Sequence, residues 1–130
     1  MRIRDKIKKP QRPVVAYEIL PPREKDGTLN TYAETISSLL SQTHIDAINI
    51  PEVHDEIGRG ERPVSNQERG EPRKFGMLLQ DIVGIEAIIN RVVVHMPMKK
   101  QMEWIQETHS KYEIDNLIIV GGESSKQQYP

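Results

Sequence analysis

The sequence contains no cysteine, which excludes disulfides, thiol nucleophiles and cysteine-ligated iron–sulfur or zinc centres. It also lacks an excess of either charge: 18 Lys and Arg stand against 19 Asp and Glu. Because nucleic-acid binding generally needs a strong basic field, we expect no nucleic-acid partner. No apolar run approaches the roughly 20 residues that span a bilayer. No apolar core follows the basic first residues, so a secretory signal is not expected. These absences predict a cytoplasmic protein with no membrane association.

Aromatic residues are also scarce, at 5% of the chain, but the apolar residues are clustered, which favours a folded domain. The 130 residues suffice for one domain and are too few for two. Residues 1–13 hold six basic groups and two prolines and predict a mobile basic N-terminal arm. Contact of this arm with a polyanion or a substrate phosphate is the alternative. Residues 14–130 form the predicted domain.

Apolar, β-branched runs alternate with stretches of helical periodicity along residues 14–130. The runs predict four strands, within 14–20, 46–50, 85–95 (centred on 92–94) and 117–120. The periodic stretches predict helices around 29–40, 75–82 and 98–112, with a Thr31–Glu34 capping box and Gly84 as a helix end. Met98 and Met102 fall on the predicted core stripe of the last helix. This alternation predicts an α/β fold of parallel βα units with four strands.

Polar or small residues stand at all four predicted strand ends, where parallel sheets bind their ligands. They are Glu18; Asn49 and Glu52; His95; and Gly121, Gly122 and Glu123. Gly121-Gly122 allows a ligand to approach backbone N–H groups, although a plain βα turn explains it equally well. His95 is a cofactor contact, a general acid or a structural residue. His54-Asp55-Glu56 has no matched ligands elsewhere, so we expect no metal.

Glu18 is the sharpest candidate because it is a carboxylate inside an apolar run. Partial desolvation there would raise its pKa and suit it to donate a proton near neutral pH. The alternative is a buried structural glutamate paired with Arg23 or Arg91. Residues 52–74, which leave the second strand, are rich in Gly, Pro and charge and predict a lid or substrate contact.

Three segments resemble the amino-terminal half of methylenetetrahydrofolate reductase. Tyr17-Glu18-Ile19-Leu20-Pro21-Pro22-Arg23 resembles the family's first-strand Phe-Glu-Phe-Phe-Pro-Pro-Lys/Arg. Asp46-Ala47-Ile48-Asn49-Ile50 matches its second strand in position, and Leu117-Ile118-Ile119-Val120-Gly121-Gly122-Glu123 resembles its fourth. The resemblance covers roughly residues 14–130. It implies half of a TIM-type (βα)8 barrel, which needs about 250 residues in full.

The resemblance also implies an oxidoreductase of one-carbon metabolism. That enzyme uses FAD and NAD(P)H to reduce methylenetetrahydrofolate to methyltetrahydrofolate. By position, Glu18 matches the family's proton donor to the folate and Glu123 matches its flavin-tuning aspartate. From their places at the predicted strand ends, we expect Gly121, Gly122 and His95 to contact the cofactor and Asn49, Glu52 and Glu123 to contact the substrate. A homo-oligomer or a complementing half-barrel would complete the barrel. Two alternatives remain: a non-catalytic pterin- or flavin-binding or partner-docking module, and a flavodoxin-like fold with another ligand.

Overall fold

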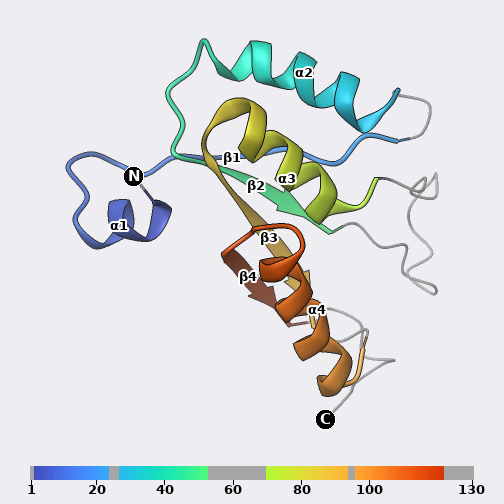
Figure 1. The fold of residues 1–130 in the computed structure, drawn as a ribbon. Coiled ribbons are helices and arrows are strands. Elements are labelled where there is room, and N and C mark those ends of the chain that lie inside the picture. The colour runs from blue at the N-terminus through green and yellow to red at the C-terminus, as the bar shows by residue number, and fades with distance from the viewer. Residues whose placement is uncertain (1, 24–26, 53–69, 94–95, 122–130) are drawn as a thin grey trace, which may run out of the picture.

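The structure is a computed structural model that describes residues 2–23, 27–52, 70–93 and 96–121. Within these ranges, four parallel strands form one sheet in the order β1-β2-β3-β4 (Figure 1). The strands are β1 (Ala16–Glu18), β2 (Ala47–Pro51), β3 (Glu86–Val92) and β4 (Asn116–Val120). The helices are α1 (Ile3–Lys8), α2 (Leu29–Leu40), α3 (Pro72–Val83) and α4 (Met98–Ser110). The predicted α/β class with parallel βα units is confirmed.

Each strand pairs with the strand before it in the sequence. This strand order tests the flavodoxin-like alternative. A flavodoxin-like sheet has the order 2-1-3-4-5, so the flavodoxin-like alternative does not fit this sheet. In the described part of the chain, α2, α3 and α4 are the crossovers between consecutive strands (Figure 1). Because crossovers share one hand, such consecutive units place their helices on the same face of a sheet.

The hydrophobic core lies on that helix-covered face. Ile48, Ile50, Ala87 and Ile89 alternate along β2 and β3 and are fully buried against Phe75 and Leu79 of α3. Ala33 and Leu40 of α2 join the same cluster. Gly76 permits the close approach of α3, since a Cβ there would lie 3.1–3.3 Å from side-chain atoms of Ile114, Ile50 and Ala87.

The opposite face of the sheet is less covered, and we call it the open face. By register it carries Glu18, Asn49, Ile88, Asn90 and Ile118. Asn49, Ile88 and Asn90 are half-buried, whereas Glu18 and Ile118 are exposed. Burial alternates along β3 between half-buried and buried residues, because every second side chain faces the core and the others lie on the open face.

Residues 1–13 were expected to be a mobile arm, and the structure corrects this expectation. Ile3 of α1 is buried, and its backbone N–H donates to Glu86 Oε1 over 2.7 Å. Lys6 Nζ lies 3.2 Å from Asp46 Oδ1, and Arg2 pairs with Asp115. The basic segment is held because three carboxylates stand at or just before the starts of three strands.

Several element boundaries also differ from the sequence prediction. The third strand runs over Glu86–Val92 and contains only the first residue of the predicted centre at 92–94. Helix α2 begins earlier than the predicted capping box, since Thr28 Oγ1 accepts the N–H of Thr31 over 3.1 Å. Gly84 ends α3 as predicted, with a φ of 79° that glycine adopts readily.

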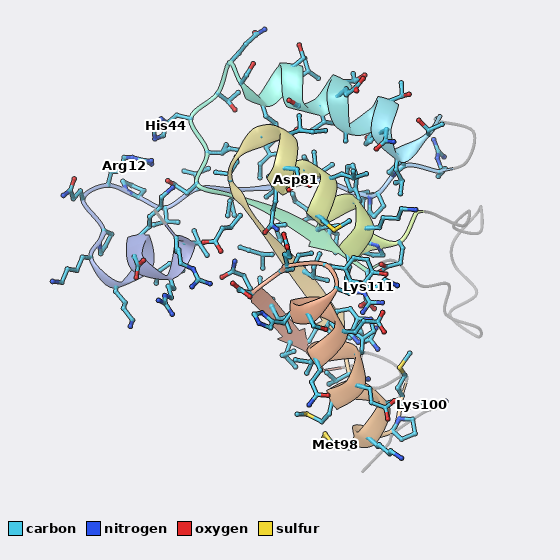
Figure 2. All side chains as sticks on the ribbon, viewed as in Figure 1. Arg12, His44, Asp81, Met98, Lys100 and Lys111 are labelled. Atoms are coloured by element: carbon cyan, nitrogen blue, oxygen red, sulfur yellow. The ribbon has the colours of Figure 1, made fainter. Side chains whose placement is uncertain are left out.

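Helix α4 follows Pro97 as predicted but buries a different face. Gln101 and Thr108 are buried, and Trp104 packs against the core. Met98 and Met102 are exposed, and Figure 2 shows Met98 at the start of α4. The predicted methionine stripe is therefore wrong. The observed face contains polar residues because it meets two buried arginines: Arg73 donates to Thr108, and Arg91, described below, donates to Gln101. No helix in the described ranges is long and apolar enough to cross a membrane.

Candidate functional site

Glu18, the last residue of β1, and Asn49, the middle residue of β2, lie side by side on the open face. The sheet register pairs the two residues directly. Glu18 is exposed, and no hydrogen bond or ion pair among the described residues engages its carboxylate. A carboxylate beside an amide can hydrogen-bond a ligand and exchange a proton with it. The structure thus brings together two of the predicted site residues.

The predicted desolvation of Glu18 is not found in the described chain. All three residues of β1 are exposed, including Tyr17 at 52%. The apolar run predicted a strand covered on both faces, but β1 is the edge strand of the sheet and its neighbour lies on one side only. The alternative pairing with Arg91 is also not found, because that guanidinium pairs with a different glutamate.

Asn49 is joined on the open face by Asn90 of β3, which the sequence analysis did not select. The register pairs Asn49 with Ile88, two residues before Asn90, so both amides point to the same side. Their Oδ1 atoms are buried and have no hydrogen-bond partner. A buried unpaired acceptor costs about 1–3 kcal/mol. The sequence signal was the polar residue two positions after Ile88 in an apolar strand.

Glu52 lies just after β2 and forms a buried ion pair rather than a free ligand-binding group. Arg91 Nη1 donates to Glu52 Oε1 over 2.9 Å, and both side chains are 6% exposed. Arg91 Nε also donates to Gln101 Oε1 over 2.9 Å, and its guanidinium lies 4.1 Å from the centroid of Trp104. Through Arg91, Glu52 therefore links the end of β2 to β3 and α4.

Gly121 follows β4 and is exposed, and no atom of the described residues beyond its chain neighbours lies within 4 Å of the position a Cβ would occupy. This open space agrees with the predicted ligand approach, although it would also admit a larger residue. The predicted site residues His95, Gly122 and Glu123 lie outside the described residues. Most of the predicted lid, residues 53–69, and the triplet His54-Asp55-Glu56 lie outside them too.

The strongest electrostatic perturbation lies at the other end of the strands. Asp46 is buried, and the Val15 N–H and the Arg12 guanidinium donate to its carboxylate, with Lys6 also in contact. These donors hold the pKa of Asp46 well below its usual range, against the opposing effect of burial. A carboxylate held ionised in this way is a structural anchor for the basic segment and not a proton donor.

Comparison with known proteins gives no family for this chain. No family model matches it, and no curated protein matches it either. Among the described residues, no three His, Asp or Glu side chains lie together as ligands for a metal ion. The function must therefore be argued from the open face of the sheet and from the sequence resemblance.

Proposed function

We propose that the chain is the amino-terminal half of a methylenetetrahydrofolate reductase-type (βα)8 barrel and takes part in reducing methylenetetrahydrofolate with NAD(P)H. The observation that carries the proposal is the pairing of Glu18, the last residue of β1, with Asn49 in the middle of the adjacent parallel strand β2. Glu18 lies within Tyr17–Arg23, the segment with the most specific resemblance to the family. Its exposed carboxylate is available to a substrate on the open face.

The half-barrel form of the proposal is supported by the consecutive strand order. Successive βα units that pair in sequence order are the building pattern of (βα)8 barrels. In such a barrel the open face would line the interior, and Glu18, Asn49 and Asn90 would point into it. A second copy of the chain or a complementing half-barrel would pair with the free edges of β1 and β4. A cytoplasmic location belongs to the same proposal.

The proposed roles follow from where the residues stand. Glu18 delivers a proton to a pterin nitrogen as the methylene bridge opens, and Asn49 orients the substrate beside it. Arg91 holds Glu52, which keeps the end of β2 in place. Glu123 contacts both substrate and cofactor in this proposal, and His95 and Gly122 complete the cofactor contacts.

FAD is the cofactor that the resemblance implies, and its fit to the described residues rests on one observation. The open space beside Gly121 at the end of β4 leaves room for a flavin ring or phosphate to approach the backbone. When bound, FAD would carry hydride from NAD(P)H to the folate. The chain's own contribution is to hold the substrate and to place the Glu18 proton.

The experiment is a Glu18→Gln substitution assayed for NAD(P)H-dependent reduction of methylenetetrahydrofolate with added FAD. It uses the assembled protein, as a homo-oligomer or with its complementing half. Loss of the transferable proton should lower turnover by about 10²–10⁴-fold, the usual contribution of general acid catalysis. Reduction of bound flavin by NAD(P)H should stay nearly unchanged. Glu34→Gln, at an exposed glutamate of α2, is the matched control.

Turnover by the Glu18→Gln variant at the parent rate would remove Glu18 from the mechanism. A second candidate function, a non-catalytic pterin- or flavin-binding or partner-docking module, is favoured by the open edges of the four-stranded sheet. Binding of a reduced folate or flavin by the assembled protein without any turnover would support the module and refute the reductase.

A further inference from the structure

A cavity of about 240 Å³ lies between α1 and the segment that joins α1 to β1. Its walls are residues 9–14 together with Lys6 and Asp46. Figure 2 shows Arg12 on this segment, beside α1. Asp46 and Val15 stand just before the first residues of β2 and β1, so the cavity lies at the amino ends of the strands. It is therefore separate from the open-face site around Glu18.

The charges on the cavity wall are unbalanced. Lys6, Lys9 and Arg12 are cationic, and Asp46 is the one acidic residue that lines the cavity. Arg12 binds both oxygens of Asp46, with Nη1–Oδ2 3.1 Å and Nη2–Oδ1 2.7 Å. Lys6 shares the same carboxylate. The Asp46 carboxylate is thus paired with both Lys6 and Arg12. With three cationic residues and one carboxylate, the cavity wall carries a net positive charge.

Lys9 is the cation that this arrangement leaves available. No carboxylate of the described residues lies within ion-pair distance of its ammonium group, whereas Lys6 and Arg12 both have Asp46. Gln11 adds an amide donor to the same wall. Both residues line the cavity, and their ammonium and amide groups are N–H donors suited to an anion.

The wall is also held in place before any ligand arrives. Pro10 and Pro13 fix their own φ angles on either side of Arg12. Asp46 ties this segment down twice, through Arg12 and through the N–H of Val15 at 2.8 Å. The backbone that carries Lys9 and Gln11 is therefore anchored at Arg12 and Val15, which reduces the conformational entropy lost on binding. Helix α1 closes the cavity from the other side with Lys6.

We propose that this cavity is a binding site for a small phosphate-bearing anion, with Lys9 as the principal cation and Lys6, Arg12 and Gln11 as supporting donors. The ligand is inorganic phosphate or a phosphate monoester. The cavity is larger than one phosphate group, so it has room for the carbon atoms of a small monoester. This site goes beyond the proposed reductase function, and neither depends on the other.

The test uses the full chain and titrates inorganic phosphate against chloride at constant ionic strength. Binding is followed by the backbone amide NMR shifts of Lys9, Gln11, Arg12 and Val14, since Pro10 and Pro13 have no amide N–H. Folding is checked by the fluorescence of Trp104, the single tryptophan, which lies on α4. Lys9→Gln should weaken binding roughly ten- to a hundredfold, the range of one charge-assisted hydrogen bond. Lys9→Arg should retain it.

Lys8→Gln is the matched control, because Lys8 is exposed, adjacent in sequence and outside the cavity wall. It removes the same charge and should leave the affinity unchanged. A parallel titration with glycerol 3-phosphate separates the two sources: tighter binding assigns the site to a monoester, and weaker binding assigns it to the free anion. Equal affinities in the parent, Lys8→Gln and Lys9→Gln, or no amide shift at Lys9, Gln11, Arg12 and Val14, would overturn the proposal. Neither outcome bears on folate reduction.

Discussion

Replacing Glu52 by Gln should destabilise the fold more than any exposed charge substitution. The change removes the carboxylate of a pair whose two side chains are each 6% exposed. Arg91 keeps its Gln101 and Trp104 contacts but is left as a buried cation without that carboxylate. Breaking a buried pair in this way typically costs about 3–5 kcal/mol, because the desolvated charge is no longer compensated.

Urea unfolding measures the effect directly. With an m-value of about 1.5 kcal/mol/M, a loss of 3–5 kcal/mol moves the unfolding midpoint down by roughly 2–3 M. Trp104 is a suitable probe, since the Arg91 guanidinium lies 4.1 Å from its ring centroid. Circular dichroism of the helices in parallel tests whether the loss is global.

A double variant separates the buried charge from the contacts around it. Glu52→Gln combined with Arg91→Met removes both charges and should recover much of the stability, because a buried pair replaced by apolar groups is often nearly neutral. Asp5→Asn is the control, at an exposed pair in which Arg4 Nε lies 3.6 Å from Asp5 Oδ1. Such a pair contributes about 0–1 kcal/mol. If Glu52→Gln costs no more than this control, the buried-pair argument is refuted.

Two further predictions concern the ends of the strands and of helix α3. Asp46→Asn should destabilise the protein at pH 7, while Asp81→Asn, at an exposed site on α3, should not. Because the folded-state pKa of Asp46 lies below the unfolded value of about 3.9, its contribution is complete above that pH. Thermal unfolding from pH 7 to pH 2 should therefore show the parent–Asn difference shrinking below about pH 4, and a constant difference would contradict the assignment. Gly84→Ala should cost about 1–2 kcal/mol in chemical denaturation because of the φ of 79°, whereas Gly121→Ala, in open space, should be near neutral; equal effects would show that φ is not the cause.

The sequence alone determined the features that depend on near neighbours in the chain. Apolar runs and helical spacing gave the alternation of strands and helices, because those periods reflect which side chains share a face. Gly84 ended α3 as predicted, since the left-handed conformation is a local steric property of the backbone. For the same reason Glu18 could be placed at the end of its strand, whereas Asn49, expected at a strand end, lies in the middle of β2, and their pairing could not be foreseen.

Only the tertiary structure decided which distant groups meet. Arg91 pairs with Glu52 from 39 residues away. Its Nε also donates to Gln101, and this second contact explains why α4 buries Gln101 instead of Met98 and Met102. The sequence predicts a solvated arm for the basic residues before Pro10. In the fold, Asp46, Glu86 and Asp115 at the strand starts bind this segment. Such pairings depend on register, burial and the net cost of desolvating both partners. The local spacing of apolar residues does not specify any of these quantities. The open face of the sheet and the docking of α1 could therefore be identified only from the tertiary structure.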